Sequence, residues 1–351
     1  MRIGKLDNDL LREIVIDKIT FRRPEVKTRP GIGEDCAVID FGEYDCVLST
    51  DPITATSERI GSLAVHVSCN DIAAGGVEPL GLLLSVLLPP ETTEGDIAEI
   101  MEQAADAAAQ IGVEIIGGHT EITPVVKQPV ITATAIGRAV PGPSPVVKPG
   151  DRLIVTKLLA MEGTGIIAAT QAEKLTGVLT PEELSESIKM LDSISVVTDG
   201  VTAARAGASN MHDITEGGVL GAIWEVCELN GVGAEIREDD LPIAAVTRKV
   251  CAHFGLDPLR LISSGSMLIV APQQAADPIC AALADAGIRA TEIGIVTERA
   301  AGVRMARAAG CGGDKRSGER GANANDSERG TAESSSYLVI EPPESDDIYK
   351  L

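Results

Sequence analysis

The sequence predicts an α/β fold divided into two domains. Its 351 residues exceed what one small core needs and suit two domains of about 150 residues each. Aromatic residues make up only 2% of the chain, so Ala, Val, Ile and Leu must build the core. Signals for strands and helices alternate along both halves, which is typical of sheets covered by helices.

The first half alternates short apolar runs with helical patterns. Residues 46–50 form the first predicted strand, which Asp51-Pro52 ends. Apolar residues at helical spacing then predict a helix over about 60–74, stopped by Gly75-Gly76. The remaining predicted elements of this half are a strand over 80–88, a helix over 97–108 ended by Gly112, and strands over 113–116 and 130–136.

Proline and glycine mark the boundary between the two domains. Residues 141–145 read Pro-Gly-Pro-Ser-Pro, and Lys148-Pro-Gly150 follows closely. The first predicted domain therefore covers residues 1–145. The second restarts with a strand over 152–156 and covers residues 151–306.

The C-terminal part of the sequence changes in composition. Residues 309–336 are rich in Gly, Ser, Glu, Arg and Asn and nearly free of large apolar side chains, so we expect a disordered insertion. A strand signal returns at 337–340, and we expect this strand to pair with 302–306. Residues 337–351 then form a C-terminal strand and tail.

Charge and the length of apolar runs exclude two classes of partner. The chain has 52 Asp and Glu against 30 Lys and Arg, a formal net charge of -22. A nucleic-acid binder needs a basic surface, so we expect no nucleic-acid partner. The longest apolar run, 80–90, is far shorter than a membrane span of ~20 residues, and residues 1–11 lack the apolar segment of a signal peptide. Seven cysteines without a CxxC pair indicate reduced thiols and a cytoplasmic location.

The common nucleotide and protease signatures are absent from the sequence. No GxxxxGK[ST] motif is present, so the chain is not a P-loop enzyme. Residues 163–168 match GxGxxA, but they begin several residues after their strand and no acidic residue closes a second strand ~20 positions later. The four histidines form no HExxH motif, which leaves a zinc protease without support.

Carboxylates beside glycines and at the ends of predicted elements are the main candidate functional residues. A single Asp near a glycine turn usually caps the turn or a helix. However, Asp71 follows Asn70 within an otherwise apolar helix, where an unpaired carboxylate is costly. Mg²⁺ takes hard oxygen ligands from separate loops, so the recurrence predicts a magnesium–phosphate site. The positions are Asp35, Asp51, Asp71, the pair His119 and Glu121, and Asp213.

Glycine-rich and hydroxyl-rich turns could contact an anion, although each also has a structural interpretation. Residues 216–221 open a helix with Gly217 and Gly218, whose free amides attract phosphates or simply form a tight helix start. Residues 261–270 indicate either a turn before a core strand or hydroxyls that line a polar pocket. Lys157 follows a predicted strand and is either a phosphate contact or an exposed lysine.

Taken together, these segments resemble the aminoimidazole ribonucleotide (AIR) synthase-related superfamily. It includes AIR synthase, the formylglycinamidine ribonucleotide amidotransferase, thiamine-monophosphate kinase, selenophosphate synthetase and HypE. The sequence is most similar to the HypE-like branch, and the resemblance extends over about 1–306. Each motif alone is weak, but their order is specific. The segments are 31–39, 49–51, 70–79, 117–120, 156–157 with 162–164, and 212–218.

The resemblance implies a two-domain α/β (α+β) fold of the AIR synthase type. The N-terminal domain would form a barrel shared with a second subunit, so a homodimer is implied, and ATP would lie with Mg²⁺ in the cleft between domains. The implied chemistry is phosphoryl transfer from ATP to an amide, carbonyl or other small-molecule oxygen. By motif, Asp35, Asp51 and Asp71 match metal ligands, Asp213 and His119 match catalytic positions, and the cofactor-binding positions are Gly31, Gly33, Asn70, Gly117, Gly118, Lys157, Gly217 and Gly218.

Two departures from the family pattern leave other functions open. His119 stands where the family often has an acid, and Glu121 is a second candidate for that role. HypE carries the group that it dehydrates on a C-terminal Cys, whereas the last cysteine here is Cys311. The acceptor is therefore a small molecule or a protein-borne amide or carbonyl group. The alternatives are a non-catalytic nucleotide-binding scaffold or maturation partner, and a small-molecule kinase like thiamine-monophosphate kinase.

Overall fold

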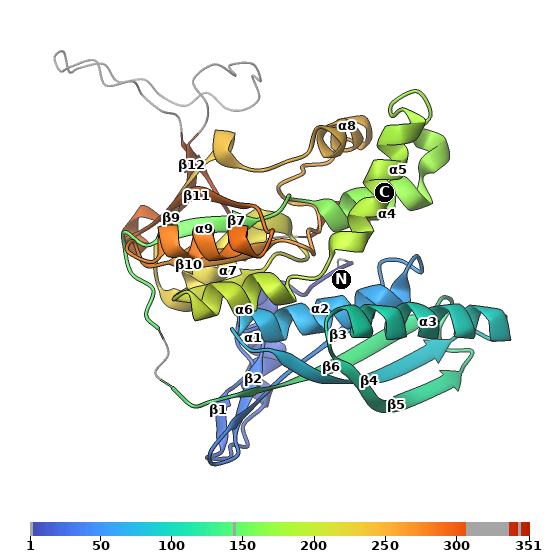
Figure 1. The fold of residues 1–351 in the computed structure, drawn as a ribbon, viewed down its shortest axis with the longest axis horizontal. Helices are drawn as coiled ribbons and strands as arrows, with labels where there is room; N and C mark the ends of the chain where they lie inside the picture. Colours follow the sequence, from blue (N-terminus) through green and yellow to red (C-terminus); the bar gives the residue numbers. More distant parts are fainter. Residues whose placement is uncertain (1–2, 143–144, 307–336, 343–344) are drawn as a thin grey trace.

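The computed structural model describes residues 3–142, 145–306, 337–342 and 345–351. Two sheets, one in each half of the chain, lie on either side of a layer of helices (Figure 1). The predicted insertion at 309–336, together with Cys311, lies outside the described residues.

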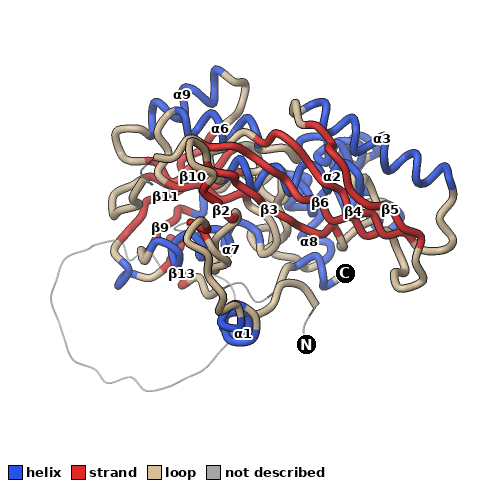
Figure 2. The backbone as a smooth tube through the Cα atoms, turned by 90° about the horizontal axis from the view of Figure 1, so that it is seen from below, coloured by secondary structure: helices blue, strands red, loops and turns tan. Residues whose placement is uncertain are grey.

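The N-terminal sheet has six strands in the order β1-β2-β3-β6-β4-β5 (Figure 2). Along β4, Leu82, Leu84, Val86 and Leu88 are buried and alternate with more exposed residues, because successive side chains point to opposite faces. Helices α2 and α3 cover the buried face (Figure 1). The elements are α1 (Asn8–Ile14), β1 (Val26–Thr28), β2 (Ala37–Asp40), β3 (Asp45–Ile53), α2 (Ile60–Ala74), β4 (Pro79–Leu88), α3 (Glu94–Gln110), β5 (Glu114–Ile122) and β6 (Val130–Ala139).

Helix α2 is the central element of the molecule. Every residue from Ile60 to Ala74 except Ser62 is buried, because α2 packs on β3 and β6 of the first sheet and on α6 and β8 of the second half. A helix that is apolar on all sides is stable only in such an interior position. Gly76, with φ +72°, allows the turn that follows the helix.

The C-terminal sheet has seven strands in the order β13-β12-β9-β11-β7-β10-β8. Helix α7 packs on one face with Leu268 and Val270, whereas α6 and α9 pack on the other face with Ile154 and Ile269. The elements are β7 (Arg152–Thr156), α4 (Met161–Thr170), α5 (Pro181–Lys189), α6 (Val197–Arg205), β8 (Asn210–Asp213), α7 (Gly218–Asn230), β9 (Gly233–Arg237), α8 (Ala245–Phe254), β10 (Met267–Ala271), α9 (Ala276–Asp285), β11 (Ala290–Thr297), β12 (Val303–Ala306) and β13 (Tyr337–Val339).

The structure confirms the α/β class and corrects two strand ends. Strand β3 continues through Asp51-Pro52 to Ile53, because Pro52 lies opposite Thr132 and the pairing with β6 extends past it. Strand β5 continues to Ile122, so His119 and Glu121 lie in a strand rather than in a loop. The predicted pairing of 302–306 with 337–340 is confirmed, since β12 and β13 are antiparallel partners.

Two features of the described residues bear on the environment of the chain. Within the described residues, no helix combines the length and the apolar character that crossing a bilayer requires. The six cysteines in this part of the chain are all free thiols. The cytoplasmic location stays a prediction.

Candidate functional site

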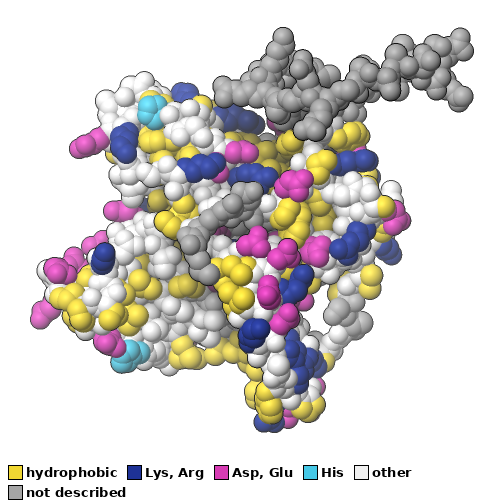
Figure 3. Space-filling model, turned by 180° about the vertical axis from the view of Figure 1, so that it is seen from behind, with side chains coloured by type: hydrophobic (Ala, Val, Ile, Leu, Met, Phe, Trp, Pro, Cys, Tyr) yellow, Lys and Arg dark blue, Asp and Glu magenta, His cyan; other side chains and the backbone are white. Residues whose placement is uncertain are grey.

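A cavity of about 710 Å³ lies between the two halves of the molecule, and four of the predicted acids line it together. Asp35, Asp51 and Asp71 come from the first half, and Asp213 comes from the second. The prediction that residues far apart in sequence share one hollow is therefore supported. Figure 3 shows that acidic side chains also gather near the middle of one face of the molecule, in keeping with the net charge of -22.

Each of these acids is held by a different element. Asp35 precedes β2, Asp51 lies on β3, Asp71 lies in the last turn of α2, and Asp213 ends β8. The hydroxyl of Ser49, two residues before Asp51 on β3, donates a short hydrogen bond to the Asp71 carboxylate. Strand β3, helix α2 and strand β8 therefore fix three of the four carboxylates on rigid elements.

Burial and mutual repulsion keep these carboxyl groups from ionising easily. Burial raises the pKa of Asp35 to about 7, and the charge of Asp213 adds to this effect against the opposing charge of His212. Burial also raises the pKa of Asp71, helped by Asp213 and Asp51. The pKa of Asp213 is raised by burial as well. Such a group of carboxyls is stabilised when a cation joins it.

His212 supplies positive charge at one side of the acids. Its Nε2 lies 3.0 Å from Glu225 Oε2 and 3.4 Å from Asp35 Oδ1, and its Nδ1 lies 2.7 Å from the backbone oxygen of Asp213. Burial lowers the pKa of His212, but the charges of Asp35 and Glu225 outweigh it and raise the pKa to about 10. His212 is therefore a cation at neutral pH that holds the Asp35 carboxylate in place.

The donor atoms fit a divalent cation. One ligand atom from each of Asp35, His212 and Asp213 lies within 4.8 Å of the others. Among the described residues, Asp213 Oδ2 is buried without a hydrogen-bond partner, so it has a free lone pair for an additional ligand. Carboxylate oxygens are the ligands that Mg²⁺ prefers. Magnesium would therefore bind the carboxylates rather than the imidazole.

Both ends of the described chain meet at the mouth of this cavity. Lys5 and Tyr349 line it, and the backbone N–H of Lys5 donates to Glu216 Oε1 at 2.9 Å. Asp346 accepts the backbone N–H of Gly217 at 2.7 Å and that of Ile348 at 2.8 Å. The Asp346 carboxylate thus accepts the hydrogen bond of the Gly217 amide, for which the sequence predicted a phosphate as the partner.

The predicted glycines divide between the cavity and its surroundings. Gly31 and Gly33 line the cavity in the loop before Asp35. Gly217 and Gly218 do not line it, and Gly218 packs instead against the backbone of Leu259, where a Cβ would meet the carbonyl oxygen at 2.5 Å. This packing favours the second interpretation given for Gly217 and Gly218, a tight helix start, and their contact with a phosphate stays a prediction.

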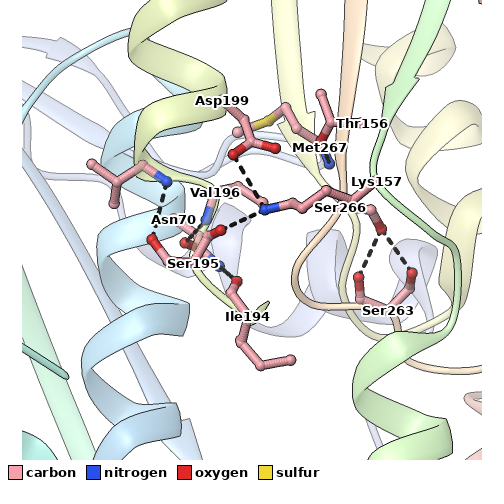
Figure 4. A network of polar contacts seen from close by, with 11 residues as sticks. Asn70, Thr156, Lys157, Ile194, Ser195, Val196, Asp199, Ser263, Ser266 and Met267 are labelled. Atoms are coloured by element: carbon pink, nitrogen blue, oxygen red, sulfur yellow. Dashed lines mark hydrogen bonds and ion pairs between the residues drawn. The ribbon is translucent and has the colours of Figure 1, made fainter. Parts of the chain in front are cut away.

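Asn70 and Lys157 both lie outside the cavity (Figure 4), and Asn70 joins the two halves of the molecule. The amide of Asn70 donates to Ile194 O at 2.9 Å, and its oxygen accepts the Val196 N–H at 2.8 Å. Lys157 Nζ donates to Ser195 O at 2.6 Å and to Asp199 Oδ2 at 3.2 Å. Both side chains therefore bind the start of α6 and the residues just before it, and their contact with a nucleotide stays a prediction.

His119, Gly117 and Gly118 lie apart from the acids in this chain. Strands β6 and β4 lie between β5 and β3. His119, on β5, is therefore roughly 14 Å from strand β3. The His119 side chain is 67% exposed and its Nε2 lies 3.3 Å from Glu121 Oε2. Gly118 has φ +146°, and a Cβ there would meet Leu84 O at 1.9 Å. These glycines permit close strand packing, and the structure does not bring His119 to the cavity.

Seven charged residues that line the cavity are not among the predicted site residues: Lys5, Arg29, Glu34, Glu162, His212, Glu216 and Glu225. Glu162 and Glu225 are carboxylates within apolar helices, the same signal that singled out Asp71. Burial raises the pKa of Glu162 to about 7. His212 adjoins Asp213 in a segment already singled out, whereas nothing in the local sequence marks Lys5.

Two family models match the two halves of the chain. The model of the AIR synthase related protein N-terminal domain matches residues 33–139, and that of the C-terminal domain matches residues 148–312. The carbamoyl dehydratase HypE of Rhodobacter capsulatus is 29% identical over 88% of this chain and 91% of its own length. The carbamoyl dehydratase HypE of Escherichia coli K12 is 30% identical over 73% of this chain and 75% of its own length.

Solved structures share the fold at low sequence identity. The HypE–HypF complex contains a chain that superposes with a TM-score of 0.72, at 23% identity, over 89% of this chain and 99% of that one. HypE in complex with ATP gives a TM-score of 0.66 at 23% identity, covering 88% and 93%. AaThiL with AMPPCP and TMP gives 0.68 at 18% identity, covering 87% and 96%. The ordered motifs, the two matching domains and these relatives show that the chain belongs to the AIR synthase-related family, in the branch that includes HypE.

Proposed function

We propose that this protein is an ATP- and magnesium-dependent enzyme that transfers the γ-phosphoryl group of ATP to an amide or carbonyl oxygen. The observation that carries the proposal is the convergence of Asp35, Asp51, Asp71 and Asp213 on one cavity between the two halves. Relatives named carbamoyl dehydratase, and a HypE structure with bound ATP, support the substrate class and the nucleotide.

Asp35, Asp71 and Asp213 are the residues that would hold Mg²⁺, with Asp51 next to them. A bound magnesium ion neutralises phosphate charge and orients the group that is transferred. His212 keeps Asp35 in position through its ion pair, and Glu225 in turn fixes His212. Lys5 and Arg29 line the same cavity and supply positive charge for the polyphosphate.

The proposed reaction forms one bond to the γ-phosphorus and breaks another. The substrate oxygen attacks the γ-phosphorus, the bond from that phosphorus to the bridging oxygen breaks, and ADP leaves with the bond electrons. For a carbamoyl group, the phosphorylated oxygen then departs as phosphate while the nitrogen gives up two protons, which forms a nitrile. Catalysis of this kind depends on positioning and charge neutralisation rather than on a nucleophilic side chain.

A ligand-dependent stability measurement and an ADP assay test the proposal. Mg-ATP should raise the melting temperature of the full chain, and a screen of amide and carbonyl compounds should find one that releases ADP. Asp71→Asn and Asp213→Asn should reduce both the stabilisation by Mg-ATP and the rate of ADP release at least about tenfold. Asp285→Asn, on the surface of α9, is the matched control and should change neither.

The outcomes separate three functions. ATP binding without ADP release for any acceptor would favour a nucleotide-binding scaffold. A phosphorylated small alcohol or phosphate ester would indicate a kinase instead. No stabilisation by Mg-ATP would refute the nucleotide site itself.

The exposed face of the N-terminal sheet supports a homodimer. Leu80, Leu83, Ile116 and Ile122 on β4 and β5 are 40–53% exposed. Figure 3 shows hydrophobic side chains along the lower left of the molecule, where this sheet lies. An apolar sheet face of this kind is typical of a subunit interface, and the shared barrel that the family resemblance implies would cover it.

A further inference from the structure

A second cavity, of about 820 Å³, shares no lining residue with the acid cavity described above. One wall is helix α3, and the opposite walls are the first turns of α2 and the short helical segment Met190–Ser193 of the second half. Cavities of this volume commonly bind small molecules. Nothing in the proposed phosphoryl transfer uses it.

Carboxylates dominate the lining of this cavity. Helix α3 presents Asp96, Glu99 and Asp106 at spacings of three and seven residues, which places them along one face of the helix. The lining includes a single arginine, Arg59, and its guanidinium already pairs with Asp192. Any ligand therefore meets a strongly negative surface. The six lining carboxylates are Glu58, Glu91, Asp96, Glu99, Asp106 and Asp192.

His66 gives the cavity a buried polar group without a protein partner. It lines the cavity from α2 and is only 4% exposed. Among the described residues its Nδ1 has no hydrogen-bond partner, which is costly for a buried nitrogen. Burial, together with the charge of Lys157, lowers the pKa of His66 to about 4. At neutral pH the ring is therefore uncharged, and one of its nitrogens accepts a hydrogen bond.

The spacing of the acids selects the shape of the ligand. Glu99 and Asp106 are seven residues apart on α3, a distance of about 10 Å along the helix axis. Within the described residues, the cluster of His, Cys, Asp and Glu with ligand atoms close enough for one metal ion is Asp35, His212 and Asp213, in the other cavity. Separated charges of this kind match an extended organic cation better than a single metal ion.

We propose that this cavity binds an organic cation with at least two ammonium groups about 10 Å apart, which pair with Glu99 and Asp106 on α3, while His66 accepts a hydrogen bond from the cation. Such a cation is available either as a free polyamine or as the lysine side chains of a basic protein segment. This cavity is lined by both halves of the chain, by α3 on one side and by Asp192 on the other. A cation seated there therefore contacts both halves.

Calorimetric titration of the full chain with spermidine, at fixed ionic strength, tests the inference. We expect one site per chain, and a double variant Glu99→Gln/Asp106→Asn should bind about tenfold more weakly. The matched control, Glu94→Gln/Glu102→Gln, removes two carboxylates of the same helix that do not line the cavity, and it should change affinity less than about twofold. His66→Leu should also weaken binding, while Mg-ATP should still stabilise the cavity variants.

Three results would overturn the inference. Equal loss in both double variants would mean that spermidine binds the acidic surface in general. Equal effects of spermidine and of MgCl₂ at the same ionic strength would mean that charge screening is measured. No saturable binding of either spermidine or a tetralysine peptide would exclude the ligand class, whereas binding of only one of the two identifies the source of the ammonium groups. Because Mg-ATP stabilisation is read separately, these failures do not depend on the proposed function.

Discussion

At the scale of single residues, the candidate site holds several buried carboxyl groups and few cations that compensate their charge. Asp35, Asp71 and Asp213 repel one another in a cavity where burial already raises the pKa of each. His212 is the nearest buried cation, with two carboxylates within 3.4 Å of its Nε2. The site is therefore sensitive both to proton concentration and to the loss of His212.

We expect His212→Asn to destabilise the fold by about 3 kcal/mol, because it leaves Asp35 and Glu225 buried without their cation. It should also weaken Mg-ATP binding at least about tenfold, since Asp35 loses the partner that holds it. Chemical denaturation and a nucleotide titration measure the two effects. His253→Asn, on the exposed side of α8, is the control. An unchanged nucleotide affinity in a folded His212→Asn protein would contradict the positioning role.

Magnesium affinity should depend on pH. Burial raises the pKa of Asp35 to about 7, so below this pH a proton occupies the carboxyl group and must leave before a metal binds. Affinity should therefore rise as the pH increases through about 7, and the raised pKa values of Asp71 and Asp213 act in the same direction. Calorimetric Mg²⁺ titrations between about pH 5.5 and 8 measure this. A flat profile would argue against Asp35 as a ligand.

At the scale of elements, helix α2 both carries Asp71 and joins the halves of the molecule. One turn of this helix presents Asp71 to the cavity and Asn70 to the backbone at Ile194 and Val196. Neighbouring residues of α2 thus place a carboxylate in the cavity and connect the two halves of the molecule. The sequence predicts both Asn70 and Asp71 as site residues, because adjacency alone does not show that the two side chains point to different partners.

Asn70→Ala should lower the free energy of unfolding by about 2–3 kcal/mol. The substitution leaves the Val196 N–H and the Ile194 carbonyl buried without partners, which costs more than an average hydrogen bond. Asn230→Ala removes one side-chain hydrogen bond at the end of α7 and serves as the control, with an effect of about 1 kcal/mol. Urea unfolding of both variants measures the difference. Equal losses of unfolding free energy in the two variants would show that the Asn70 contact between the halves contributes no more than an ordinary side-chain hydrogen bond.

Much of the element order could be predicted from the sequence because it depends on local patterns. The apolar helix α2, the run that forms β4 and the periodic helix α3 all follow from hydrophobic spacing. The end of β5 could not be predicted, because Gly117 and Gly118 look like a turn until Leu83 and Leu84 of β4 pack against them. The role of Asp346 at Gly217 is equally non-local, since 129 residues separate the two partners.

At the scale of the whole molecule, the exposed face of β4 and β5 indicates how two chains associate. Leu83→Glu/Ile116→Glu should convert a dimer of about 73 kDa into a monomer of 36.5 kDa, because it puts charges into the proposed interface. Leu229→Glu, on α7 of the second half, is the control and should leave the mass unchanged. Light scattering measures both. A wild-type chain that is monomeric at all concentrations would refute the dimer.

The meeting of both chain ends beside the acid cavity has a practical consequence for handling this protein. Ser345 Oγ donates to Ile3 O at 3.3 Å, and Tyr349 packs close to Gly4 while it lines the cavity. An affinity tag fused before Met1 or after Leu351 would therefore start within a few residues of the proposed nucleotide entrance. Purification handles are better placed in a surface loop, or removed by protease before any ligand is titrated, so that a weak signal reflects the enzyme and not its label.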